Sequence, residues 1–409
     1  MLYTRNMSNK TLVDLDQWLA PHKSTIQARE KYISSKLKTV LSGKTPAEFA
    51  MGFLHFGLHK TDVGWTFREW APNATRMFLV GDFSDWKERE EFALNRGGNG
   101  EWSIDLPENS LRHGQKYKLR VYWPGGDGWR LPSYANYVVQ DENSVDFSAV
   151  VWSPKTPYDW QYKTPPKPKV PLIYEAHVGM SSQEEKVASF SEFTTEVLSR
   201  IKESGYNTIQ LMAIAEHPYY GSFGYHVSNF FAVSSRFGTP DDFKKLVDTA
   251  HGMGLRVIID LVHAHAAKNE VEGLGNFAGD PTQYFKPTNH PEWDSRLFDY
   301  GKPEVLHFLA SNCRWWLDEY HIDGFRFDGV TSMIYHDHGL GKSFTSYDDY
   351  FRDDVDKDAL AYLRLANETI HAVHSDATTI AEEMSGFPGL GASTKDGGLG
   401  FDYRLQMGA

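Results

Sequence analysis

Length, composition and charge limit the class of protein first. The chain has 409 residues, of which 41% are hydrophobic and 23% are charged, as in ordinary globular proteins and unlike disordered or fibrous ones. Its formal net charge of -12 makes nucleic acid and acidic membrane surfaces poor partners. A single cysteine, Cys313, excludes an internal disulfide.

The first residues, "MLYTRNMSNKTLVD", contain no apolar segment of the kind that signal peptides carry, so we predict a cytoplasmic protein. From Leu15 to Leu41, apolar residues recur at helical spacing, which predicts one or two short surface helices within an N-terminal helical segment, residues 1–56.

Residues 57–152 change to short runs with period-two character, such as "VGWTFREWA" and "YKLRVYW", between Gly, Pro and Asn turns. This pattern predicts a small β-sandwich domain. Aromatic residues are 14% of the chain, and flat rings with polar edges suit the faces of sugars. Five tryptophans of this region are candidate sugar platforms, although we expect most in its core: Trp65, Trp70, Trp86, Trp102 and Trp129. A proline-rich connector, residues 153–171, follows.

Strands and helices then alternate through residues 172–409. Because the strands lack polar alternation and each is followed by a helix, they predict a parallel sheet buried on both faces. Either an open doubly wound sheet or a TIM-type (β/α)8 barrel has this pattern. The expected strands are 171–178, 206–214, 255–265, 321–330 and 377–384, and the expected helices are 190–205, 239–254, 303–320 and 356–374.

The charged residues favour the barrel. Catalytic groups of (β/α)8 barrels come from the C-terminal ends of several strands, and here acidic, basic and histidine side chains gather at those ends. No glycine-rich phosphate-binding turn follows any strand, which weakens a dinucleotide fold. These side chains are His177, Asp260, His265, Arg326, Asp328, Glu382 and Glu383.

Two of these carboxylates suggest glycoside chemistry. Arg326 and Asp328 share one face of a strand, so Arg326 would hold Asp328 ionised as a nucleophile. Glu382, on a short apolar strand beside a second acidic residue, would keep its proton and act as an acid. A pair of carboxyls, one ionised and one protonated, is the arrangement that glycosidases use to cleave a glycosidic bond. The alternative is a buried salt bridge without chemistry. "HAH" and "HDHG" lack the spacing of a zinc site, and we expect no metal or other cofactor.

Several segments resemble a known family. "DLVHAH" (260–265), "GFRFDGVTS" (324–332) and "AEEMSG" (381–386) look like three of the four signature regions of the α-amylase superfamily of glycoside hydrolases. "YNTIQLMAIAEHPYYGSFGYHVSNFF" and "WDSRLFDYG" are similar to the 1,4-α-glucan (glycogen) branching enzymes, and "VGDFSDW" resembles the family 48 carbohydrate-binding module that precedes their barrels.

The resemblance implies Asp328 as the nucleophile of a covalent glycosyl intermediate and Glu382 as acid and then base. It also implies a monomeric glycosyltransferase that moves a chain of an α-glucan, such as glycogen or amylose, to a glucose 6-hydroxyl. A hydrolase of the same superfamily and an inactive glucan-binding protein remain as alternatives. Four further residues would line the subsite of the transferred glucose, with the first stacking on its ring: Tyr225, Asp260, His265 and Arg326.

One departure concerns the family's fourth signature, a His-Asp pair that supplies a third carboxylate. Nothing after Phe401 contains it, and "YHDH" (335–338) lies instead in the loop after the fourth strand. Only five strands are expected, whereas a closed barrel has eight. We therefore expect a C-terminally truncated chain, an incomplete barrel with an exposed apolar edge strand, and little activity from the 409 residues alone.

Overall fold

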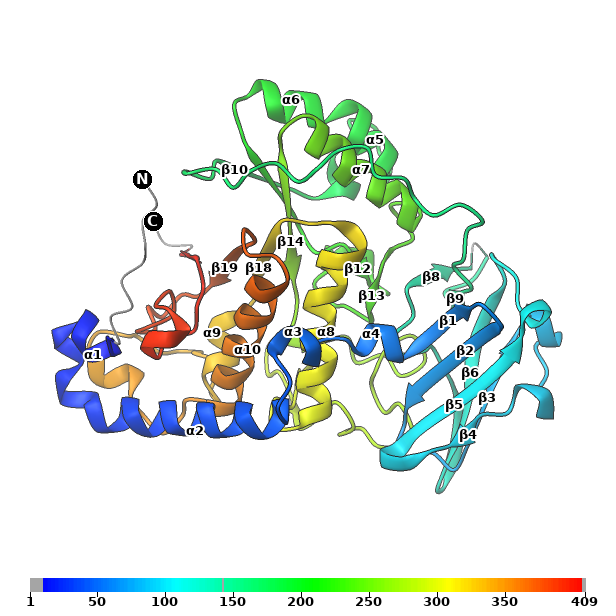
Figure 1. Ribbon diagram of the computed structural model, residues 1–409, viewed down its shortest axis with the longest axis horizontal. Coiled ribbons are helices and arrows are strands. Elements are labelled where there is room, and N and C mark those ends of the chain that lie inside the picture. The colour runs from blue at the N-terminus through cyan, green and yellow to red at the C-terminus, as the bar shows by residue number, and fades with distance from the viewer. Residues whose placement is uncertain (1–9, 142, 407–409) are drawn as a thin grey trace.

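The structure, a computed structural model, describes residues 10–141 and 143–406 (Figure 1). Residues 1–9 of the expected N-terminal segment, and residues 407–409 of the expected barrel region, lie outside the described residues. Within the described part, no helix combines the length and the apolar character needed to cross a membrane.

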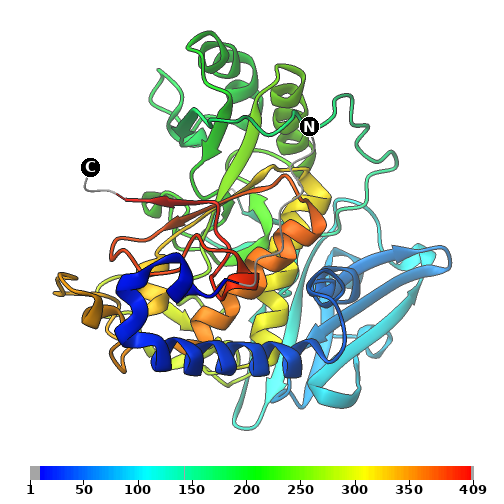
Figure 2. The same cartoon turned by 60° about the vertical axis from the view of Figure 1, so that its left-hand side comes forward.

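The N-terminal segment is helical, as predicted. Its longest helix, α2, packs along α10, where Arg364 donates to both carboxylate oxygens of Glu30 at 2.8 and 2.6 Å. Figures 1 and 2 both show α2 running across the helices of the C-terminal half. The helices are α1 (Leu12–Leu15), α2 (Lys23–Leu41), α3 (Pro46–Phe49) and α4 (Gly52–His55).

The next region is built from antiparallel strands, as their period-two pattern predicts. One sheet has the order β1-β2-β5-β4, and the second contains β8-β9-β6-β3, with β7 paired to β6. Alternate side chains such as Phe67 and Leu119 are buried, and Trp65 and Trp102 belong to this core. The strands are β1 (Gly57–Thr61), β2 (Gly64–Trp70), β3 (Arg76–Gly81), β4 (Asn95–Arg96), β5 (Glu101–Pro107), β6 (Lys116–Trp123), β7 (Gly126–Arg130), β8 (Tyr137–Gln140) and β9 (Phe147–Val150).

The second of these sheets extends into the C-terminal half. Strand β13 (Asn229–Ser234) pairs in parallel with β8, and β12 (Ala215–Glu216) pairs with β13. The loop that follows the second strand of the parallel sheet is therefore hydrogen-bonded to the β-rich region. A shared sheet restricts relative movement of its strands, so the two regions are mechanically connected.

The C-terminal half contains a six-stranded parallel sheet in the order β10-β11-β14-β18-β19-β20. Five strands lie where the sequence predicts them: β10 (Ile173–Ala176), β11 (Thr208–Leu211), β14 (Arg256–Leu261), β18 (Gly324–Phe327) and β19 (Thr378–Glu382). The helices of this half are α5 (Phe190–Glu196), α6 (Leu198–Glu203), α7 (Pro240–Gly252), α8 (Pro303–Tyr320), α9 (Val330–Ile334) and α10 (Lys357–Val373). A small antiparallel sheet joins β15 (His265–Ala266), β17 (Arg296–Phe298) and β16 (Phe285–Asn289).

Local sequence explains where these helices begin. Thr239 and Asp242 form a capping box, in which Thr239 Oγ1 accepts from the Asp242 N–H at 3.2 Å and the Asp242 carboxylate accepts from the Thr239 N–H at 2.9 Å. Pro240 occupies the first helical position, where no N–H is needed. The helix expected over 190–205 is divided into α5 and α6 at Val197.

The strand count of five is corrected by a sixth strand, β20 (Tyr403–Leu405), which pairs in parallel with β19. A strand of three residues is too short to give a periodic signal in the sequence. The described residues supply no further strand for the outer edges of β10 and β20, so the barrel is partial. Tyr174 on β10 and Tyr403 on β20, at these two edges, are each 38% exposed.

Candidate active site

The register of the parallel sheet brings the predicted site residues together. Asp260 of β14 lies directly opposite Arg326 of β18. Glu382 ends β19, the other neighbour of β18, and Asp328 follows β18 directly. Because the carboxyl ends of parallel strands share one edge of the sheet, side chains far apart in sequence converge here.

Arg326 connects the three carboxylates. Its Nη1 lies 2.6 Å from Asp328 Oδ1 and 3.1 Å from Asp260 Oδ2, and its Nη2 lies 2.9 Å from Glu382 Oε1. The guanidinium is buried, with a side chain only 7% exposed. A planar fork of donors can hold several carboxylates at fixed angles, which a lysine cannot.

Tyr225 and Asp260 form the second part of the site. The Tyr225 hydroxyl donates to Asp260 Oδ2 at 2.6 Å, and Gln210 of β11 donates from Nε2 to Asp260 Oδ1 at 2.8 Å. Burial raises the pKa of Asp260 to about 7, against the opposing effects of Arg326 and Tyr225. Gln210 is absent from the predicted site, although a polar residue inside the apolar run "YNTIQLMAI" is the signal that could have found it.

His265 is held as a neutral ring. Burial lowers its pKa to about 4, and its Nε2 lies 2.8 Å from the carbonyl oxygen of Tyr225, to which it therefore donates. Its buried Nδ1 has no hydrogen-bond partner in residues 10–141 and 143–406. A buried acceptor without a partner is costly unless a ligand supplies the donor.

The electrostatics of the two reactive carboxyls differ. Burial raises the pKa of both Asp328 and Glu382. For Asp328, the charge and the hydrogen bond of Arg326 oppose this rise in pKa. For Glu382, the neighbouring negative charge of Asp328 raises the pKa further. A single shared proton is therefore favoured on Glu382.

Glu383 does not have the effect on Glu382 that the sequence suggested. Its carboxylate is fully buried and turned to the following loop, where it accepts from the N–H groups of Ser385, Gly386 and Phe387 at 2.7, 2.8 and 3.1 Å. Asp328, not Glu383, is the acidic neighbour that raises the pKa of Glu382. Successive residues of a strand point to opposite faces, which explains the difference.

A cavity of about 690 Å³ opens at these side chains. Tyr225, His265, Asp328 and Glu382 line it, whereas Asp260 and Arg326 lie one layer deeper, behind Tyr225 and Asp328. A volume of this size accommodates a small ligand. Sequence reasoning missed several further lining residues: Tyr219, His226, Glu292, Trp293, Thr331 and Met384. His338, from the segment "YHDH", also lines it.

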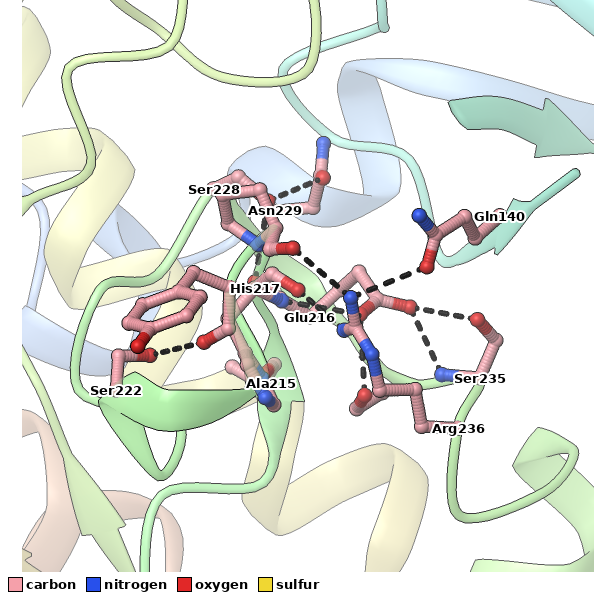
Figure 3. A network of polar contacts seen from close by, with 12 residues as sticks. Gln140, Ala215, Glu216, His217, Ser222, Ser228, Asn229, Ser235 and Arg236 are labelled. Carbon is pink, nitrogen blue, oxygen red and sulfur yellow. Dashed lines mark hydrogen bonds and ion pairs between the residues drawn. The ribbon is translucent and has the colours of Figure 1, made fainter. Parts of the chain in front are cut away.

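A polar cluster around the fully buried carboxylate of Glu216 anchors the loop that carries Tyr225 (Figure 3). Glu216 Oε1 accepts from Ser234 Oγ and from the His217 N–H, both at 3.0 Å, and Glu216 Oε2 accepts from the Ser235 N–H at 2.8 Å. Arg236 donates to Glu216 Oε1 at 3.2 Å, to the Pro218 carbonyl at 2.9 Å and to Gln140 Oε1 at 3.2 Å. Because Gln140 belongs to β8, the β-rich region contributes directly to holding this loop.

His177, the remaining strand-end histidine, follows β10 and packs against the loop that carries Tyr225. Its Nδ1 accepts from the Met180 N–H at 3.1 Å, and its ring lies edge-on to Tyr220 and Phe223 at 5.9 and 5.5 Å between centroids. It is not among the residues that line the cavity. We conclude that His177 packs beneath the site and does not open into it.

Two family matches agree with this arrangement. Residues 55–135 match Carbohydrate-binding module 48 (Isoamylase N-terminal domain), and residues 194–275 match Alpha amylase, catalytic domain. Among solved structures, a pullulanase from Bacillus acidopullulyticus superposes with a TM-score of 0.63 at 20% identity, covering 80% of this chain and 41% of that one. The catalytic module of a glycogen-degrading pneumococcal virulence factor superposes with a TM-score of 0.63 at 19% identity, covering 80% and 50%. The fold is therefore that of an α-amylase-type catalytic domain with a partial barrel, preceded by a domain that matches carbohydrate-binding module 48.

The chain is also similar to curated relatives over nearly its whole length. The chain is 47% identical to a 1,4-alpha-glucan-branching enzyme of Yarrowia lipolytica over 96% of its length, and 46% identical to those of Equus caballus and Solanum tuberosum over 97% and 98%. The chain is homologous to the 1,4-alpha-glucan-branching enzymes along nearly its whole sequence. It spans 60%, 58% and 48% of the length of these three relatives.

Proposed function

We propose that this chain carries the donor site of a glycogen- or starch-branching reaction, in which an α-1,4-glucan is cleaved with retention and transferred to a glucose 6-hydroxyl. The observation that carries the proposal is the shared guanidinium of Arg326, which binds Asp328 and Glu382 at 2.6 and 2.9 Å beside a cavity. One guanidinium that binds both carboxyls holds them side by side, as a pair that acts on one glycosidic bond requires.

In the first step, the ionised carboxylate of Asp328 attacks the anomeric carbon of a bound glucose. The bond from that carbon to the leaving glucan oxygen breaks, and Glu382 donates its proton to this oxygen. The lowering effect of Arg326 on the pKa of Asp328, and the raising effect of Asp328 on the pKa of Glu382, support this division of roles. A covalent glycosyl ester on Asp328 is the product.

In the second step, a 6-hydroxyl of an acceptor glucan attacks the same carbon. Glu382, now ionised, accepts the hydroxyl proton, and the ester bond to Asp328 breaks. Tyr225, His265, Asp260 and Arg326 would hold the transferred glucose, the first two from the cavity wall and the last two through Tyr225 and Asp328. The unpartnered Nδ1 of His265 supports this assignment, since a sugar hydroxyl can donate to it.

The proposal includes the organisation and setting expected from the sequence. We assign an N-terminal helical segment to residues 1–56, a glucan-binding β domain to 57–152, a connector to 153–171 and the catalytic region to 172–409. The protein would act as a cytoplasmic monomer on α-glucan polysaccharide without a cofactor. The glucan-degrading and glucan-branching names of its relatives support the substrate class.

Trapping the glycosyl intermediate tests the proposal. The chain is incubated with a 5-fluoro-α-glucosyl fluoride, which forms the ester but turns it over slowly, and peptides are analysed by mass spectrometry. We expect a fluorinated hexose adduct on the peptide that contains Asp328 and none in Asp328→Asn, and a slow build-up, since little activity is expected from the 409 residues alone. Asp348→Asn is the matched control, because its side chain is 87% exposed and lies outside the cavity, so the adduct should remain.

Amylose assays separate the alternatives. A fall in iodine absorbance without a matching release of reducing ends indicates branching, whereas matching reducing ends indicate hydrolysis. Retention on amylopectin with neither change indicates glucan binding without catalysis. An adduct on any residue other than Asp328 would overturn the assignment of the nucleophile.

A further inference from the structure

The tip of the β16–β17 hairpin, residues 290–295, is fixed beside the cavity by His290. The backbone N–H of His290 donates to the Ser295 carbonyl at 2.9 Å, and His290 Nδ1 accepts from the N–H groups of Glu292 and Trp293 at 3.2 and 3.1 Å. His290 itself is only 2% exposed. A buried side chain that accepts two backbone N–H groups holds such a turn in one conformation.

The same histidine supports the indole ring of Trp293. The two rings stack with centroids 3.9 Å apart and an interplanar angle of 8°. His338 packs behind His290 with centroids 4.4 Å apart. Because Nδ1 of His290 is an acceptor and burial lowers its pKa to about 4, the stacked ring is neutral. One face of the indole is therefore covered, and the ring is only half-buried overall.

The indole also lies close to the reactive carboxylate. A Cβ atom placed on Gly329, the residue after Asp328, would lie 3.2 Å from Trp293 Cη2. The rings of Trp293 and His265 have centroids 5.0 Å apart. Trp293, His265, Asp328 and Glu382 line one cavity. The indole thus lies beside the residue that follows Asp328, at the wall of the same cavity.

We propose that Trp293 is a stacking platform for the glucose unit next to the one held at Asp328, positioned by His290 beneath it. The inference rests on the proposed function and extends it to a second sugar-binding position. The apolar face of a pyranose ring packs well on an indole, which offers a large rigid surface at little conformational cost. Glu292, the exposed neighbour of Trp293, supplies a carboxylate that can accept a sugar hydroxyl at the rim.

Fluorine NMR of the chain labelled with 5-fluorotryptophan tests this directly. The sequence contains 12 tryptophans, and the resonance of Trp293 is the one that disappears in Trp293→Phe. On titration with maltoheptaose we expect this resonance to shift with saturation, while that of Trp18, 77% exposed on the N-terminal segment, stays in place. The variant serves only to assign the resonance, and the titration itself is measured on the native chain.

Affinities complete the test. We expect Trp293→Ala to bind maltoheptaose about 3- to 10-fold more weakly, in line with a single aromatic stack, and Trp293→Phe to lose less. Trp18→Ala is the control and should bind like the native chain. An unmoved Trp293 resonance, with binding weakened by Tyr225→Ala, would overturn the inference and leave the proposed function standing. Failure of the native chain to bind, or binding unaffected by both Trp293→Ala and Tyr225→Ala, would overturn both.

Discussion

Two arginine–carboxylate clusters of similar composition lie in the C-terminal half, and they differ in how far their carboxylates are exposed to solvent. The sealed cluster comprises Gln140, Glu216, Ser234, Ser235 and Arg236, and the open cluster comprises Asp260, Arg326, Asp328 and Glu382. In the sealed cluster, Glu216 is 0% exposed and both of its oxygens accept hydrogen bonds. In the open cluster, the side chains of Asp328 and Glu382 are 14% and 19% exposed beside a cavity.

The comparison shows how structural and reactive charge clusters can be distinguished. A structural cluster satisfies its lone pairs internally, because unsatisfied buried polar groups cost stability. Burial raises the pKa of the carboxyls in both clusters, whereas the open cluster also brings several acidic groups close to one another. A neighbouring histidine of each cluster, His265 or His217, has a buried ring nitrogen without a partner in the described part of the chain, but of these two only His265 lines the cavity. Close acidic groups beside a cavity are retained where a ligand completes the arrangement.

The largest expected effect concerns pH. The pKa of Asp260 is raised from 3.8 to about 7 in the folded chain, so the folded state holds this proton more tightly than the unfolded state does. Its contribution to stability is complete below about pH 4 and is lost as the pH rises through 7. Asp260→Asn removes the titration. Urea unfolding should show the advantage of the native chain over this variant shrinking by up to about 4 kcal/mol between pH 4 and pH 7.5. A pH-independent difference would contradict the raised pKa.

The same substitution in the two clusters should give unequal losses of stability. Glu216→Gln leaves Arg236 buried without its carboxylate and places an amide donor against other donors, so we expect a loss of about 3 kcal/mol in the free energy of unfolding. Glu382→Gln replaces a carboxyl that is favoured in its protonated, neutral form with a neutral amide of the same shape, so its free energy of unfolding should stay within about 1 kcal/mol of the native value. Thermal and urea unfolding measure both. Equal losses would remove the distinction between the clusters.

Backbone strain beside Asp328 gives a smaller effect. Gly329 has a φ of +62°, and an added Cβ would lie 3.2 Å from Trp293 and 3.3 Å from Ala264. Gly329→Ala should cost about 2 kcal/mol of unfolding free energy, from the left-handed backbone and from this contact. Gly341→Ala is the matched control, because it has the same φ with nothing within 4 Å, and we expect about 1 kcal/mol. Equal losses would show that the indole does not pack tightly at this position.

The smallest effect concerns the link between the two regions. Gln140 of β8 accepts one hydrogen bond from Arg236, whose same Nη2 also donates to the Pro218 carbonyl. Gln140→Ala should therefore reduce the free energy of unfolding by only about 1 kcal/mol. Gln17→Ala, which removes one exposed bond to the Val13 carbonyl, should change it by less than about 0.5 kcal/mol. A loss of unfolding free energy near that of Glu216→Gln would mean that the bond from the β-rich region supplies most of the stability of the sealed cluster.

Much of the site could be predicted because charges at strand ends are visible in the sequence. The run Ile322 to Val330, with Arg326 and Asp328 two residues apart, predicts a strand whose charged face opens at its end, and the structure has this arrangement. Glu216 and Arg236 carry no comparable signal. Their segments read as loops, and only the pairing of β13 with β8 brings Gln140 to them.

The sequence by itself determined the alternation of strands and helices and the carboxyl-end position of the charged groups, because these depend on local periodicity and residue type. Its motifs supplied the resemblance to the branching enzymes. Only the tertiary structure decided which acidic neighbour raises the pKa of Glu382, which residues lie behind the cavity and which ring lies beside Asp328. Those properties depend on distances and burial between segments far apart in the chain, which local patterns do not specify.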